Sequence, residues 1–246
     1  MSAPRRLVLV GDDLPRAARA ARAAGFTVVT RAPEAVLCHG GDGTLLRAHR
    51  EWPALPKVPV RVAARARLCP EHALEAVLER LRAGDLQCEA LPLLRCEMGR
   101  LVLHAVNDVV LRNESPATAV RLRVRIDGRD SGEVTGDGVV CATPFGSTGY
   151  YRSITRRTVT RGLGLAWNNA TEPLPPLDLP AGQPLEIEVL RGPAVLVHDN
   201  DPRGVALREG HRVRITLSSA EAVVLGLDAL RCQRCRKDDG SAFNPH

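Results

Sequence analysis

Apolar and polar residues alternate along this chain in two different ways. In the first third, short apolar runs such as residues 7–10 and 35–38 are separated by longer stretches in which apolar residues recur every three or four positions, as in residues 74–81. The longer stretches are typical of helices with one buried face, and the short runs fit buried strands. Strands that alternate with helices predict a parallel sheet covered by helices.

Turn and capping residues mark the ends of the predicted helices. Asp12 and Asp13 offer an N-cap, with Pro15 in the first turn, for a helix that ends at Gly25. Gly84 occupies the position that follows a helix C-terminus. The expected elements are strands at 7–10, 26–30 and 35–38, a helix from Leu45 onwards and a helix over 71–83.

After about residue 98 the period becomes two. Apolar residues alternate with arginines over 120–126, an Asp127-Gly128 pair follows as a hairpin signal, and the alternation returns at 185–189 and 213–217. One-sided alternation predicts an antiparallel sheet or sandwich, with the arginines at 121, 123 and 125 on its solvated face. Residues 168–184 contain several prolines and are expected to form a long loop.

The predicted fold class is therefore α/β followed by β. We expect an α/β domain with a mostly parallel sheet over residues 1–98 and an all-β, sandwich-like domain over 99–225. The remaining tail, residues 226–246, is expected to pack on the first domain.

Composition narrows the functional class. The 246 residues are 44% hydrophobic and 25% charged, which is typical of a folded soluble protein, and no apolar run is long enough to span a bilayer. The net charge is +6, but the arginines are dispersed and aromatic residues make up only 3%, so a base-stacking platform is not indicated. We expect no nucleic-acid or membrane partner. We expect the seven cysteines to be reduced thiols, as is usual in cytoplasmic proteins, and we expect this protein to be cytoplasmic.

The segment Gly40-Gly41-Asp42-Gly43-Thr44 lies where a predicted strand ends and a helix begins. Glycines let backbone amides approach a ligand closely, and a helix N-terminus attracts phosphate. No Walker-type lysine follows, and Asp42 would repel phosphate unless it holds a metal or accepts a proton. The alternative is a tight turn in which Asp42 caps the next helix.

Two further segments carry candidate chemistry. Residues 136–150 read GDGVVCATPFGSTGY, a buried strand that runs into a turn rich in small polar residues and suited to a nucleotide. Asn107-Asp108 is a polar pair in an otherwise apolar stretch, which fits either ligand binding or a turn.

Cys232 and Cys235 form a C-x-x-C pair. A structural zinc site requires a second pair of ligands, which Cys69 and His72 would supply only if the end of the chain folds back on the first domain. We therefore expect thiols here and name no metal ligand.

Taken together, these segments resemble the NAD kinase family. The resemblance rests on GGDGT at 40–44, on Asn107-Asp108 in the family's Asn-Glu position, and on residues 136–150 against the family's GDG…TPTGSTAY pattern. It extends weakly to His198-Asp199-Asn200, which is similar to the family's late Asp-Gly step.

The resemblance implies transfer of a phosphoryl group from ATP or polyphosphate, with Mg²⁺ or another divalent cation, to the 2′-hydroxyl of the adenosine ribose of NAD. Asp42 would be the catalytic base. The residues implied to bind NAD or the phosphoryl donor are Gly41, Gly43, Thr44, Asn107, Asp108, Asp137, Thr148, Gly149, Tyr150, Ser153 and Asp199. A homodimer or homotetramer with sites shared between chains is also implied.

The chain departs from the family pattern at several positions. Asp108 is one methylene shorter than the usual glutamate, Phe145 replaces a small polar residue, and Gly149 stands in place of alanine. Arg156-Arg157 replaces a Gly-Gly pair, and two cations there would suit a phosphate. The alternatives are a lipid or sugar kinase that shares only GGDGT, and an inactive NAD(P)-binding sensor.

Overall fold

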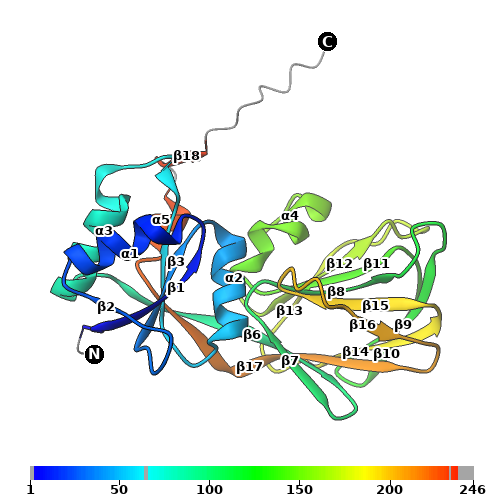
Figure 1. Cartoon of the computed structure of the whole chain (residues 1–246). Helices are drawn as coiled ribbons and strands as arrows, with labels where there is room; N and C mark the ends of the chain where they lie inside the picture. The colour runs from blue at the N-terminus through cyan, green and yellow to red at the C-terminus, as the bar shows by residue number, and fades with distance from the viewer. Residues whose placement is uncertain (1–2, 64–65, 233, 238–246) are drawn as a thin grey trace. The chain divides into compact units, whose positions relative to one another are not determined.

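The computed structural model describes residues 3–63, 66–232 and 234–237, and the chain divides into two compact units (Figure 1). Unit 1 comprises Met1–Ala90 and Ala222–His246, and unit 2 comprises Leu91–Glu221. Strands β6 (Cys88–Met98) and β17 (Arg212–Leu225) contain residues of both units. The boundaries expected at 98 and 225 are the last residues of these strands, and residues 233 and 238–246 of the expected tail lie outside the described residues.

Unit 1 is a parallel sheet with helices on both faces. Its elements are β1 (Arg6–Gly11), α1 (Leu14–Ala23), β2 (Thr27–Val28), β3 (Ala35–His39), α2 (Asp42–Glu51), β4 (Lys57–Val60), β5 (Ala66–Arg67), the 3-10 turn η2 (Pro70–His72), α3 (Leu74–Ala83), α5 (Asp228–Arg231) and β18 (Arg236–Lys237). The strand order is β2-β1-β3-β4, and the end of β17 joins β4 in parallel.

The two faces of this sheet are covered by different helices. Helices α1 and α3 bury their apolar residues in one core with Leu7 and Leu37, while α2 packs on β1, β3 and β4 from the other side (Figure 1). The predicted caps are confirmed, because the Asp13 side chain accepts the Arg16 amide and Gly84 follows α3 with φ +78°. Helix α2 begins three residues before Leu45, which brings Asp42 into its first turn.

Unit 2 is a sandwich of two antiparallel sheets. Its elements are β7 (Leu101–Ala105), β8 (Asp108–Asn113), β9 (Val120–Ile126), β10 (Arg129–Gly136), β11 (Gly138–Ala142), the 3-10 turn η3 (Gly146–Thr148), α4 (Tyr150–Thr155), β12 (Leu163–Asn168), β13 (Leu177–Leu179), β14 (Leu185–Arg191), β15 (Ala194–His198) and β16 (Val205–Leu207). One sheet has the order β13-β12-β11-β8-β15-β16. The other contains β10, β9, β14 and β17 in this order, with β6 paired to β17 and β7 paired to β6.

Alternate residues of the two sheets meet in one core. Leu122 and Ile187 from one sheet lie in the same buried cluster as Leu111 and Cys141 from the other. Strand β11 is buried on its second face as well, because Tyr151 of α4 packs there. This double burial explains the continuous apolar run of β11, and the predicted α/β-then-β fold class is confirmed.

The turns and charges of unit 2 follow the sequence with one exception. Asp127 and Gly128 both have positive φ, as a two-residue hairpin turn requires. Arg123 and Arg125 lie outside the core and pair with Glu133 and Glu188. The expectation that residues 168–184 form only a loop is wrong, because β13 adds a three-residue edge strand to β12, too short to stand out from the prolines around it.

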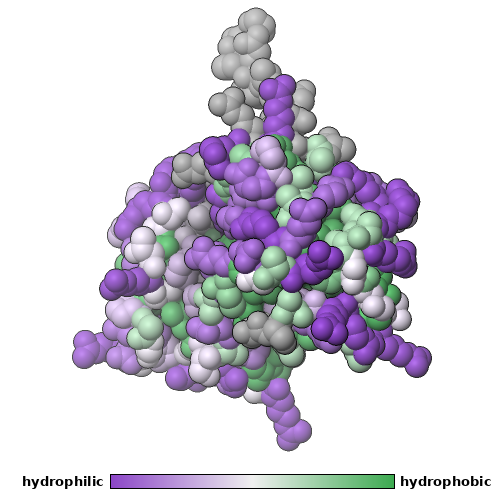
Figure 2. All heavy atoms as spheres, turned by 90° about the vertical axis from the view of Figure 1, so that its left-hand side faces the viewer, coloured by the Kyte–Doolittle hydropathy of each residue, from purple (hydrophilic) through white to green (hydrophobic). Residues whose placement is uncertain are grey.

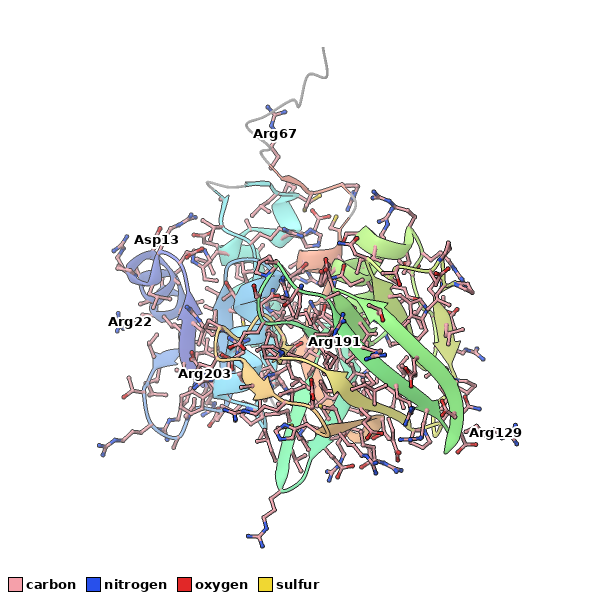
Figure 3. All side chains as sticks on the ribbon, turned by 90° about the vertical axis from the view of Figure 1, so that its right-hand side faces the viewer. Asp13, Arg22, Arg67, Arg129, Arg191 and Arg203 are labelled. Atoms are coloured by element: carbon pink, nitrogen blue, oxygen red, sulfur yellow. The ribbon has the colours of Figure 1, made fainter. Side chains whose placement is uncertain are left out.

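The surface carries dispersed rather than clustered charge. Figure 3 shows Arg22, Arg67 and Arg129 pointing away from three different elements, α1, β5 and β10. Hydrophilic side chains cover most of the face in Figure 2, with smaller apolar patches between them. Among the described residues, no helix is both long enough and apolar enough to cross a membrane.

Candidate functional site

The turn between β3 and α2 carries the GGDGT segment in unit 1. The Gly40 amide donates to the Val60 carbonyl oxygen at 2.7 Å, which holds the end of β3 against β4. A Cβ atom on Gly40 would lie 2.1 Å from Thr44 Oγ1, so a side chain cannot fit there. The first glycine of the segment is therefore required by the fold itself.

Gly41 and Gly43 are different, because nothing in the described structure requires them to be glycine. A Cβ atom at either position would meet no atom within 4 Å, and neither residue has positive φ. Both are exposed at the start of α2. Space that a Cβ would fill beside a helix N-terminus suits a phosphate that approaches the backbone closely.

Asp42 is the first residue of α2 rather than its cap. Gly41 is the N-cap residue and makes no side-chain cap bond, so the alternative in which Asp42 caps the helix is wrong. Among the described residues, Oδ1 of Asp42 is buried without a hydrogen-bond partner, and Oδ2 lies 3.9 Å from Nη1 of Arg231. The turn thus holds a half-exposed carboxylate, one oxygen of which has no hydrogen-bond partner in the described part of the chain.

Sequence reasoning missed two residues that accompany this turn. His39, the last residue of β3, is buried and donates from Nδ1 to the Asp12 carbonyl oxygen at 2.6 Å, while its Nε2 has no partner in the described part of the chain. Arg231 reaches Asp42 from α5, and Arg61 secures that helix by donating to the Leu230 carbonyl oxygen. The place of His39 directly before the glycines was the available signal; nothing local marked Arg231.

In unit 2 the Asn107-Asp108 pair lies in a loop held by Asp199. The buried Asp199 carboxylate accepts the amide of Val106 at 2.7 Å and that of Asn107 at 2.7 Å, with a longer contact to the Asp108 amide. Both oxygens are thereby engaged by backbone. Within unit 2, Asp199 positions this loop.

A second loop packs against the first. The Thr143 amide donates to the Asn107 carbonyl oxygen at 2.9 Å, and a Cβ on Gly146 would lie 2.0 Å from that same oxygen. The next residues, Thr148, Gly149 and Tyr150, are exposed. Oδ1 of Asn107 is buried and has no partner among the described residues. The Asn107 loop and residues 143–150 therefore pack together, and we call this pair of loops the framework.

Asp108 is buried at the start of β8, with 6% of its surface exposed. Burial, together with the nearby negative charge of Asp199, raises the pKa of its carboxyl group to about 7. The group is consequently partly protonated near neutral pH and can donate as well as accept a hydrogen bond.

Asp137 is not part of this framework. It precedes β11, whereas Thr148 and Tyr150 follow the other end of the strand, and a five-residue strand spans about 16 Å. Its carboxylate accepts from the amide groups of Asn113 (3.3 Å) and Asn169 (2.7 Å). The segment 136–150, continuous in sequence, thus contributes two groups at opposite strand ends.

The remaining predicted positions lie on or after α4. Ser153 is exposed and donates to the Tyr150 carbonyl oxygen at 2.7 Å. Arg156 has φ +59° at the helix C-terminus, the left-handed conformation that a glycine would adopt with less strain. Arg157 pairs with Asp178 at 3.2 Å, so one of the two cations suggested for phosphate already has an acidic partner.

Comparison with known proteins finds similarity to NAD kinases. Residues 106–227 match the model of the ATP-NAD kinase C-terminal domain. The NAD kinase of Nitratidesulfovibrio vulgaris is 31% identical over 195 residues, covering 74% of this chain and 65% of that protein, and the NAD kinase of Koribacter versatilis is 38% identical over 127 residues, covering 48% and 45%. The chain is therefore similar to NAD kinases in sequence over most of its length. It spans just under two thirds of the length of the N. vulgaris relative.

Solved structures of NAD and NADH kinases share the fold of this chain. Yeast NADH kinase complexed with NADH superposes with a TM-score of 0.78 at 18% identity, covering 92% of this chain and 84% of that one. An NAD kinase from Archaeoglobus fulgidus in complex with ATP gives 0.74 at 19% identity, covering 92% and 96%.

The raised pKa of Asp108 predicts a pH-dependent stability. Between its usual pKa near 3.8 and about 7, the folded chain retains a proton that the unfolded chain has released, so the free energy of unfolding falls as pH rises. Asp108→Asn should make this decline shallower by up to about 1.4 kcal/mol per pH unit. Urea denaturation from pH 4.5 to 8 measures it, with exposed Glu209→Gln as control. Equal slopes for Asp108→Asn and the unaltered chain would refute the assignment.

Proposed function

We propose that this chain is an NAD kinase that phosphorylates the 2′-hydroxyl of the adenosine ribose of NAD, with ATP as donor. One observation carries the proposal: Oδ1 of Asp42 is a buried acceptor with no partner among the described residues, set between two glycines that leave room for phosphate. A carboxylate in this setting accepts the proton of an attacking hydroxyl, and phosphoryl transfer otherwise needs mainly positioning and charge neutralisation.

Unit 2 supports NAD as the acceptor rather than a lipid or sugar. The matched C-terminal domain model covers the Asn107 loop and the Thr148–Tyr150 surface, and Asn107 and Asp108 offer polar groups that suit a dinucleotide. The same proposal assigns ligand contacts to Thr44 and Ser153, whereas Asp199 acts by holding the loop.

A divalent cation is part of the proposal. The β3–α2 turn offers one carboxylate and open backbone, a set that suits Mg²⁺ carried mainly by the phosphates of ATP rather than enclosed in a protein cage. When bound, the ion offsets the negative charge of the phosphates. The seven free thiols support the cytoplasm as the compartment.

Asp42→Asn tests the role of the base. The variant should form NADP from ATP, Mg²⁺ and NAD with kcat lowered by about two to four orders of magnitude, because the amide cannot accept the proton. Its thermal stabilisation by NAD should persist, since the side chain is not needed for binding. Running NADH and polyphosphate in parallel identifies the preferred acceptor and donor.

Asp13→Asn is the matched control for this substitution. Asparagine caps α1 as well as aspartate does, so activity should not change. Full activity of Asp42→Asn would remove the base assignment. Stabilisation by NAD without any turnover in the unaltered chain would instead indicate an inactive sensor.

The Gly43→Ala variant tests whether glycine at position 43 is needed for ligand binding rather than for folding. An added Cβ meets no atom within 4 Å and alanine favours a helix, so the melting temperature should stay the same or rise. The KM for ATP should rise at least about tenfold if phosphate occupies this space. Gly210→Ala, at φ +82° with open surroundings, should do the reverse: lower stability and unchanged KM. An unchanged KM in Gly43→Ala would contradict the phosphate cradle.

The separation of Asp137 from Tyr150 supports a homo-oligomer. Two groups a strand length apart cannot contact the same end of a dinucleotide within unit 2, but each can serve a pocket completed by a second copy. Co-expressed Asp42→Asn and Asp137→Ala chains should then show more activity than either variant alone, because mixed dimers contain one intact site. No recovery, or a fully active monomer in sedimentation, would refute the shared site.

A further inference from the structure

Four side chains with metal-binding atoms meet in unit 1, outside the turn that carries Asp42. Cys69 and His72 come from the segment before α3, and Cys232 and Cys235 follow α5 near the end of the described chain. Their ligand atoms all lie within 4.8 Å of one another. The sequence gives the two pairs as C-x-x-H and C-x-x-C, and the structure joins them into one set of four.

The distances are those of ligands around a common ion. Cys69 Sγ lies 3.9 Å from Cys232 Sγ, and His72 Nδ1 lies 3.2 Å from Cys235 Sγ. A tetrahedral zinc ion, with Zn–S near 2.3 Å and Zn–N near 2.0 Å, separates its ligand atoms by about 3.5–3.8 Å. A disulfide would require about 2.05 Å, and all three cysteines are free thiols.

Backbone pairing places the two ligand pairs opposite each other. Strands β5 and β18 pair antiparallel, with Arg67 opposite Arg236. Cys69 therefore follows one strand closely while Cys235 directly precedes the other, and the Cys69 amide donates to Cys235 Sγ at 3.3 Å. This bond holds Cys235 Sγ close to Cys69.

A carboxylate holds the histidine ring from its other side. His72 is buried with 4% of its surface exposed, and its Nε2 lies 3.1 Å from Asp228 Oδ2, which also accepts from Arg80 at 3.2 Å. Nε2 thus donates to the carboxylate, which leaves the lone pair of Nδ1 directed at the cysteines. A carboxylate on the second ring nitrogen is the arrangement that orients metal-binding histidines.

We propose that Cys69, His72, Cys232 and Cys235 bind one Zn²⁺ ion in a closed structural site. Three thiolates and one imidazole favour zinc among the common metals, and four protein ligands leave no position for a substrate. The ion joins segments 163 residues apart in sequence, so its binding offsets the entropy lost when the end of the chain docks.

The site also bears on Asp42. Helix α5 begins at Asp228, which contacts the ligand His72, and ends at Arg231, next to the ligand Cys232. Arg231 Nη1 lies 3.9 Å from Asp42 Oδ2. Zinc therefore holds Arg231 beside the carboxylate, and this second step rests on the proposed kinase function.

Metal analysis of the purified full-length chain tests the site. We expect about one zinc per chain, and a Cys232→Ser/Cys235→Ser double variant should lose at least about tenfold in zinc content. Cys88→Ser, an exposed cysteine outside the cluster, should keep the zinc. Zinc absent from the unaltered chain after addition of Zn²⁺, or retained in full by the double variant, overturns the proposal.

Cobalt substitution decides the matter if the double variant does not fold. The unaltered chain loaded with Co²⁺ should show the intense visible bands of tetrahedral cobalt together with thiolate charge transfer, and Zn²⁺ should bleach both. Weak octahedral bands, or none, would overturn the site. NADP formation by a chain without zinc would leave the proposed function intact, and zinc binding without NADP formation would leave the metal site intact.

Discussion

The proposed chemistry of unit 1 depends on one buried oxygen of the Asp42 carboxylate, which has no donor among the described residues. An unpartnered polar atom of this kind destabilises a folded chain, and the rest of the β3–α2 turn shows why it is retained. Gly40 is required for the turn to close, whereas no atom of the described residues requires glycine at positions 41 and 43. The proposed function accounts for these features with a phosphate at the two glycines and a hydroxyl donor beside Asp42.

Unit 2 also contains buried polar groups with hydrogen-bond partners next to buried polar groups without them. Asp199 has both oxygens occupied by the backbone of residues 106–108, and the Thr143–Gly146 segment closes on the same loop. Asn107 Oδ1 is left without a partner among the described residues, and Asp108 is buried enough to hold a proton near neutral pH. The satisfied groups hold the framework together, and the proposed function assigns Asn107 and Asp108 to the ligand.

Local sequence patterns predicted the helices and strands well, but they could not predict which distant segments pair with one another. Period-two alternation located β9 and β14, and a 3.6-residue period located α3, because each depends on which face of one element is buried. Asp137 and Tyr150 belong to one short sequence segment, which suggested a single site. Strand β11 runs between them and separates the two residues in space. The meeting of Cys69 with Cys232 depends on the pairing of β5 with β18, which neither two-residue strand reveals alone.

The central claim concerns a single hydrogen bond, and a crystal structure of this chain with NADP tests it most directly. The account predicts that the 2′ oxygen of the adenosine ribose lies within about 3.2 Å of an Asp42 carboxylate oxygen, with the 2′-phosphate beside the Gly41 and Gly43 backbone. A bound dinucleotide whose 2′ oxygen points into solvent, away from Asp42, would contradict it.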